Sequence, residues 1–181
     1  LGYTWQKVGL VPAMGLALFT GFAGGAFNGV LVTRWKLPPL VVTLATWALY
    51  RGLAMVISKA QPVSNFPEWF AWLGQKSVGP VPTQLIIWLA LVTAFVLVVE
   101  GTPVGRYTIA VGDNVRAARF AALPVLRLTF WVYAVTGLLC GLAALIFTSL
   151  VRTTKADAMS ELALDVITAV VLGGTAITGG R

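Results

Sequence analysis

The chain has 181 residues, of which 58% are hydrophobic and 10% are charged, whereas a soluble domain carries about a quarter charged residues. Its net charge of +7 comes from Lys and Arg residues scattered singly along the chain, which argues against the basic stripe of a nucleic-acid-binding protein. The absence of histidine and the single Cys140 exclude zinc sites, disulfides and Cys–His catalytic pairs within these residues. We therefore expect an all-α, polytopic transmembrane helical bundle.

The first hydrophobic stretch covers residues 8–32 and contains no charged side chain. It is long enough to span a bilayer, which takes about 20 apolar residues. Small residues along a membrane helix let the backbones of two helices approach closely. Such residues recur along this stretch at Gly15, Gly21, Gly24, Gly25 and Gly29. The pattern predicts a spanning helix with one face packed on another helix.

A second span is expected over residues 40–58, after Pro38 and Pro39. Arg51 interrupts it, and a charge at the centre of a membrane helix costs roughly 2.5 to 3.5 kcal/mol on insertion scales. One interpretation is that Arg51 faces the protein interior, a cavity or an interface. The other is that the span ends early and the long side chain reaches the headgroups. The sequence favours neither.

Residues 59–84 form the longest polar connection and contain four prolines. Trp69, Phe70 and Trp72 cluster in it beside Glu68. Because tryptophan gathers at the headgroup level of a bilayer, we expect Trp69 and Trp72 in a short helix on the membrane surface. Stacking of these rings on a ligand is the alternative.

Three further hydrophobic stretches follow, at residues 85–99, 128–151 and 166–177. The last one reaches the end of the chain without a closing polar segment, and the chain begins without a methionine. We therefore expect residues 1–181 to be a partial transmembrane domain, truncated at both ends, with about five spans.

The distribution of Lys and Arg on alternate sides of these spans predicts the orientation. One side holds Arg34, Lys36, Arg106, Arg116, Arg119, Arg127 and Arg181. The other side holds Lys7, Lys59, Lys76, Arg152 and Lys155. Because basic residues are enriched on the cytoplasmic side, residues 101–127 are expected in the cytoplasm and residues 59–84 outside.

The polar segment 101–127 contains a helical pattern of small residues. Alanines recur at helical spacing beside Arg116 and Arg119, at Ala117, Ala118, Ala121 and Ala122. This predicts a short amphipathic helix over residues 114–123, capped by Asp113 or Asn114. A face of small residues would suit docking into a cleft on another protein. The alternative is a helix that only joins two spans.

Six motifs occur in a fixed order along the chain. They are GAFNG at residues 25–29, TL at 43–44, RGLA at 51–54, GRY at 105–107, GDNVRAAR at 112–119 and DVITAVVLGGT at 165–175. Together they resemble the ribose-type permease family, the membrane subunits of bacterial ABC importers for monosaccharides and related small molecules. The resemblance covers nearly the whole chain.

The resemblance implies a dimeric permease of which this chain holds roughly the middle half. Residues 101–127 would then be a cytoplasmic loop that couples the permease to a separate ATP-binding subunit. This loop would contact the subunit through Gly112, Asn114, Ala117, Ala118 and Arg119. The other implied partners are an external solute-binding protein, a second permease subunit and the bilayer of the bacterial inner membrane, with no nucleic acid. The chain would be a transporter and not an enzyme, without catalytic residues, metal or cofactor.

The chain departs from the family pattern at two places. The family usually has a glycine where Ala122 stands, and Pro124 follows closely, so the end of the coupling helix is expected to be shaped differently here. Many members also carry a glutamate where Ala163 stands, whereas here Glu161 lies nearby. This leaves the role of an acidic pair with Asp165 open.

Polar side chains and paired glycines within the spans are the candidates for a solute path: Asn28, Thr43, Arg51, Gly173, Gly174 and Thr175. Amides and hydroxyls supply the hydrogen bonds that hold a neutral sugar, although threonine in a membrane helix often bonds its own backbone. Adjacent glycines break helices, and broken helices commonly line transport paths. A phosphate-binding loop is the alternative, but no Gly-Lys-Ser/Thr sequence follows.

We therefore predict the membrane-spanning permease subunit of a bacterial ABC importer for a monosaccharide or similar small polar solute, driven by a separate ATPase subunit. Within the same superfamily, the alternative is another cargo, such as a branched-chain amino acid or an autoinducer. Outside it, the alternative is a non-transport membrane scaffold that uses Arg116 and Arg119 on anionic lipid.

Overall fold

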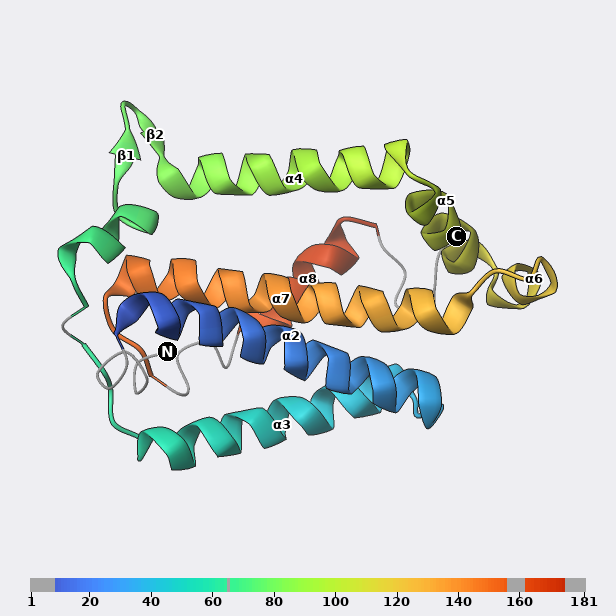
Figure 1. The fold of residues 1–181 in the computed structure, drawn as a ribbon, viewed down its shortest axis with the longest axis horizontal. Coiled ribbons are helices and arrows are strands. Elements are labelled where there is room, and N and C mark those ends of the chain that lie inside the picture. Colours follow the sequence, from blue (N-terminus) through green and yellow to red (C-terminus); the bar gives the residue numbers. More distant parts are fainter. Residues whose placement is uncertain (1–8, 65, 156–161, 175–181) are drawn as a thin grey trace.

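The computed structural model describes residues 9–64, 66–155 and 162–174 (Figure 1). Four long helices dominate it: α2 (Leu10–Arg34), α3 (Pro39–Ser58), α4 (Thr83–Gly101) and α7 (Val125–Val151). Shorter elements join them: η1 (Glu68–Leu73), β1 (Ser77–Val78), β2 (Val81–Pro82), α5 (Pro103–Asp113), α6 (Val115–Phe120) and α8 (Leu162–Leu172). Apart from the small antiparallel pair of β1 and β2, all of these elements are helical, which confirms the expected fold class.

In the described part of the chain, α2, α3, α4 and α7 are the four helices long and apolar enough to cross a membrane. They run in alternating directions between the same two ends, so η1, β1 and β2 gather at one end and α5 and α6 at the other (Figure 1). The fifth expected span corresponds to α8, which has 11 residues and is shorter than a span requires. Residues 175–177 of that expected span lie outside the described residues.

The most extensive packing in the described chain is between α2 and α7. It is built on glycines that approach backbone to backbone: Gly21, Gly25 and Gly29 of α2, and Gly137 and Gly141 of α7. A Cβ atom at Gly21 would lie 2.6 Å from the Gly137 carbonyl oxygen, and one at Gly25 would overlap the Tyr133 carbonyl. The helix-packing face predicted from the glycine spacing is therefore confirmed, and its partner is α7.

Helix α3 contacts α2 over a smaller area. The Tyr50 hydroxyl donates a hydrogen bond to the Gly24 carbonyl over 3.1 Å, and the Tyr50 ring lies beside Gly24, 3.5 Å from where a Cβ atom would stand. Beyond this contact α3 continues without a break to Ser58. The helix itself therefore extends past Arg51, as the predicted span 40–58 does.

Residues 66–84, which we call the η1 cap, cover the end of the bundle opposite α5 and α6. Phe70 is fully buried and packs with Phe66 and Leu10. The Ser149 hydroxyl donates a 2.5 Å hydrogen bond to the Phe70 carbonyl, and the Gln75 amide donates to the Leu150 carbonyl over 2.8 Å. These contacts fix the η1 cap on the last turn of α7.

The short helix expected around Trp69 and Trp72 is present as η1, a 3-10 helix with both indole rings about half-exposed. With three residues per turn, the two rings stand on one face of η1. Their place at the membrane surface stays a prediction.

The glycine contact between α2 and α7 predicts the effect of one added methyl group. Gly25→Ala should lower the unfolding free energy by about 1 to 3 kcal/mol, because the methyl would force the two backbones apart. Gly15→Ala is the matched control, since no atom lies within 4 Å of a Cβ at Gly15 on the same helix. Thermal unfolding of the full-length protein in detergent measures both, and equal midpoints for the two variants would refute the close packing.

Candidate functional site

Residues 102–124, which we call the α5–α6 link, extend beyond the ends of α4 and α7 (Figure 1). Helix α5 starts at Pro103, a residue suited to the first turn of a helix. Gly105 then lies against the end of α4, where a Cβ atom would overlap the Val99 backbone. The glycine of the GRY motif at residues 105–107 thus allows α5 to turn sharply away from α4. Helix α5 was not predicted from the sequence.

Asn114 separates α5 from α6. Its backbone is extended, and its side-chain oxygen accepts hydrogen bonds from the backbone N–H groups of Arg116 and Ala117 over 3.0 and 3.1 Å. These are two of the amides at a helix start that have no partner within the helix. Of the two residues predicted as possible caps, Asn114 is the cap, whereas Asp113 is the last residue of α5.

Helix α6 ends at Phe120, three residues earlier than predicted. The Leu123 N–H donates to the Ala118 carbonyl and the Ala122 N–H to the Arg119 carbonyl, each over 3.1 Å. This pair of bonds is the Schellman ending of a helix, which requires a left-handed residue that is usually glycine. Ala122 adopts that conformation with φ of +57°, at a cost of roughly 1 to 2 kcal/mol. Pro124 then disfavours a helical conformation at Leu123.

The backbone at Ala122 is therefore the one that glycine adopts most easily. The resemblance led us to expect a differently shaped helix end, because the family usually has a glycine there. In this chain the left-handed residue at the end of α6 is an alanine, and its backbone is more strained in that conformation than a glycine would be.

One of the four alanines in the predicted docking face is not accessible. Ala118 is 4% exposed and packs within the chain, whereas Ala117, Ala121 and Ala122 are exposed. Helical spacing grouped these residues, but it could not reveal that α7 already lies near α6. Gly112, Asn114 and Arg119 are exposed, as predicted for contact residues.

The most exposed large hydrophobic side chain in the described chain is Phe120, at 93%. It follows Arg119 at the end of α6, and Arg116 stands one turn earlier, also exposed. Neither arginine forms an ion pair with a described residue. The sequence interpretation missed Phe120, although an aromatic residue next to arginines in a polar segment was a readable signal. The α5–α6 link thus presents one apolar ring flanked by positive charge.

Two of the predicted path residues have unpaired polar atoms. Asn28 on α2 and Arg51 on α3 are half-buried, and neither the Asn28 Oδ1 nor the Arg51 Nε has a hydrogen-bond partner in the described chain. The Arg51 guanidinium lies 5.7 Å from the ring centre of Trp47, which attracts it weakly. Both interpretations of Arg51 therefore stay predictions.

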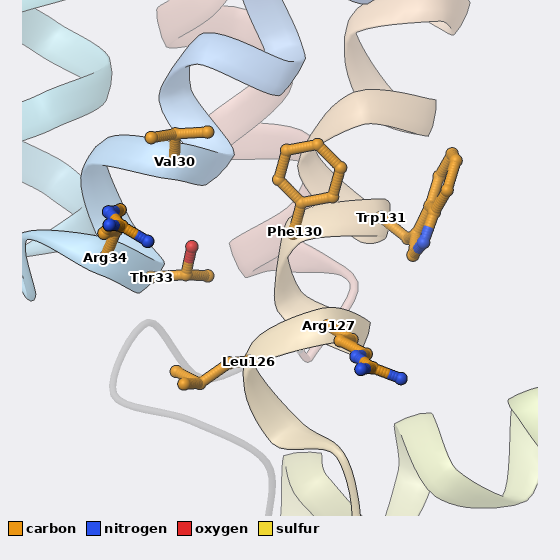
Figure 2. Close-up of a pocket in the computed structure, with 7 residues that line it drawn as sticks. All are labelled: Val30, Thr33, Arg34, Leu126, Arg127, Phe130 and Trp131. Carbon is orange, nitrogen blue, oxygen red and sulfur yellow. The ribbon is translucent and has the colours of Figure 1, made fainter.

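The other path candidates are less favourable. The Thr43 hydroxyl donates to the Pro39 and Leu40 carbonyls of its own helix, over 3.0 and 3.2 Å. It is therefore already bonded to its own backbone, which was the alternative to a role in the solute path. Gly173 and Gly174 follow the end of α8, and Gly174 has φ of +91°, which agrees with the predicted break. Thr175 lies outside the described residues. A hollow at the α5–α6 end, between α2 and α7, is lined by none of these residues (Figure 2).

The described residues hold no group of three or more His, Cys, Asp or Glu side chains that could bind a metal ion. Two features of the described structure bear on function. Polar groups lie within helices that are long enough to span a membrane, and the α5–α6 link is exposed at one end of these helices.

Comparison with known proteins finds a matching family and several relatives. A family model described as branched-chain amino acid transport system / permease component matches residues 2–180. The ribose import permease protein RbsC of Bacillus subtilis is 38% identical over 85% of this chain and 48% of its own length. The same protein of Haemophilus influenzae is 33% identical over 92% of this chain and 53% of its own length.

The autoinducer 2 import system permease protein LsrD of Yersinia enterocolitica is 33% identical over 99% of this chain and 56% of its own length. The chain therefore spans about half the length of the curated relatives it matches. No solved structure matches it.

The cap at Asn114 predicts a local loss of protection. Asn114→Ala should destabilise α6 by about 1 kcal/mol, and the Arg116 and Ala117 amides should then exchange with solvent roughly fivefold faster. Hydrogen–deuterium exchange of the full-length protein measures this. Asp113→Ala removes an exposed side chain that caps nothing and should leave both amides unchanged. An equal response to the two substitutions would exclude Asn114 as the cap.

Proposed function

We propose, from the premise that this chain belongs to the family of branched-chain amino acid transport system permease components, that it forms part of the membrane path of an ABC importer. The chain is a multi-pass protein of the bacterial inner membrane, with four helices of spanning length in its described part. In our proposal the solute is a monosaccharide or a similar small polar molecule. ATP is bound and hydrolysed by a separate subunit.

The observation that carries this proposal is the α5–α6 link with its exposed Phe120. Phe120 is 93% exposed, and moving its apolar ring from water into a pocket on a partner would lower the free energy of the complex. Buried aromatic anchors surrounded by charged rims are typical of the residues that dominate binding energy at protein interfaces. We infer that Phe120 enters an apolar pocket of the ATP-binding subunit, and that Arg116 and Arg119 face carboxylates at its rim.

The contact set that we propose differs from the one expected from the sequence. Arg119, Ala117 and Gly112 stay in it because they are exposed, and Asn114 acts by shaping the start of α6. Ala118 leaves it because it is buried within the chain. Substitution of Ala118 by glutamate would therefore disturb the α5–α6 link itself, so it cannot test docking alone.

For the solute path we propose Asn28 and Arg51, whose unpaired polar atoms could hold hydroxyl groups of a solute. Gly173 and Gly174 would open the backbone at the end of α8. A second permease subunit would complete the path, and an external solute-binding protein would deliver the solute at the η1 cap.

The cargo is proposed from the names of the relatives. Two of them are ribose import permeases, so ribose or another monosaccharide is the first candidate. Autoinducer 2 is the second candidate, because an autoinducer 2 import permease matches nearly the whole chain.

Phe120→Ala tests the proposed docking. In the full-length protein co-expressed with its ATP-binding subunit, we expect at least a tenfold loss of co-purified subunit and a matching loss of solute uptake, since a hot-spot residue contributes about 2 kcal/mol or more. Uptake of radiolabelled ribose and of autoinducer 2 by the unsubstituted protein distinguishes the two cargoes.

Phe19→Ala serves as the matched control, because Phe19 is also an exposed phenylalanine, at 65%, but lies within the spanning helix α2. It should leave co-purification unchanged. Full co-purification and uptake with Phe120→Ala would refute docking through Phe120. Uptake by the unsubstituted protein without any ATP-binding subunit would refute the importer as a whole.

A further inference from the structure

A hollow of about 320 Å³ lies between α2 and α7 at the end of the bundle that carries the α5–α6 link. Figure 2 shows residues of α2 on one side of it and residues of α7 on the other. The residues that matter here are Val30 and Arg34 of α2, and Leu126, Arg127, Phe130 and Trp131 of α7. Its lining therefore combines two guanidinium groups with an apolar wall.

Both arginines are exposed, and neither has a carboxylate partner among the described residues. Arg34 is the last residue of α2, where the helix dipole favours a cation. Arg127 is in the first turn of α7, where the same dipole disfavours one. A cation at that place is stabilised by an anion, and the described chain supplies none.

The apolar wall continues from the arginines along the two spans. Val30, Leu126 and Trp131 are 39%, 53% and 56% exposed, so a chain of methylene groups could cover them. Phe130 also lines the hollow, and its ring lies close to Gly29, 3.1 Å from where a Cβ atom would stand. The Trp131 ring is held by contacts to Phe130 and Phe22, with ring centres 5.7 and 6.4 Å apart.

Trp131 follows Arg127 by one helical turn toward the middle of α7. Tryptophan prefers the boundary between headgroups and acyl chains, and arginine prefers the phosphates just beyond it. The order of charges, indole ring and apolar wall thus matches the order of phosphate, glycerol and acyl chain in a phospholipid. A soluble anion would use the arginines and leave the wall bare.

We propose that this hollow binds an anionic phospholipid. Figure 2 shows the Arg127 side chain directed away from Arg34, so both side chains would turn toward the phosphate to donate hydrogen bonds to it. One acyl chain would cover Val30, Leu126 and Trp131. Basic pockets between membrane helices commonly recognise anionic headgroups in this way. Lipid binding at this place does not require that the protein transports anything. The lipid would fill the side of the α2–α7 pair next to the α5–α6 link.

Native mass spectrometry of the full-length protein tests the proposal, with phosphatidylglycerol and phosphatidylcholine as probes in equal amounts. We expect at least a fivefold preference for phosphatidylglycerol. The double variant Arg34→Gln/Arg127→Gln should lose this preference, whereas Arg34→Lys/Arg127→Lys should keep a part of it. Arg106→Gln/Lys76→Gln is the control, because it removes the same charge from exposed sites outside the hollow.

A variant that fills the apolar part tests the acyl chain separately. Leu126→Trp should reduce bound phosphatidylglycerol although both arginines remain. Inorganic phosphate in excess should not displace the lipid. Equal lipid binding by Arg34→Gln/Arg127→Gln and by the control double variant, or no preference for phosphatidylglycerol in the unsubstituted protein, would overturn the site. The second result would indicate that another part of the protein covers the hollow.

Discussion

The direct contact between the backbones of α2 and α7 is the constraint on which the rest of the structure depends. In a bilayer the lipid tails are as apolar as the side chains, so helices associate through close packing and polar contacts instead of hydrophobic burial. The glycines of the two helices allow that packing. Everything attached to α7 takes its position from it: the η1 cap rests on Ser149 and Leu150 at one end, and the α5–α6 link joins at Val125 at the other.

The sequence predicted those features that depend on short-range chemistry. Glycine spacing predicted the packing face of α2, and Asn114 was one of two predicted caps because an amide before a helix binds its free N–H groups. The side of a helix that meets its own chain could not be predicted in this way. Ala118 is buried and Phe120 is exposed, and only Ala118 belonged to the predicted pattern of alanines. Spacing within one helix does not show which of its faces meets the rest of the chain.

The solute path was the least predictable part, and the reason is also physical. A path lies between helices, so its lining depends on neighbours that half of a permease does not supply. Asn28 and Arg51 keep unpaired polar atoms in the described chain, whereas the Thr43 hydroxyl is bonded to its own helix. Polarity within a span therefore identified candidates, and hydrogen bonding separated them. In the proposed transporter, α7 would connect the solute-receiving end with the end that contacts the ATP-binding subunit.

This proposal requires that the α5–α6 link faces the cytoplasm, and cysteine labelling measures that most directly. In full-length protein with Cys140→Ser, single variants Phe120→Cys and Trp69→Cys place one thiol at each end of the bundle. A membrane-impermeant maleimide added to right-side-out spheroplasts should label the cysteine at position 69 at once. It should label the cysteine at position 120 only after the membrane is permeabilised. The reverse pattern would contradict the orientation and, with it, docking of an ATP-binding subunit on Phe120.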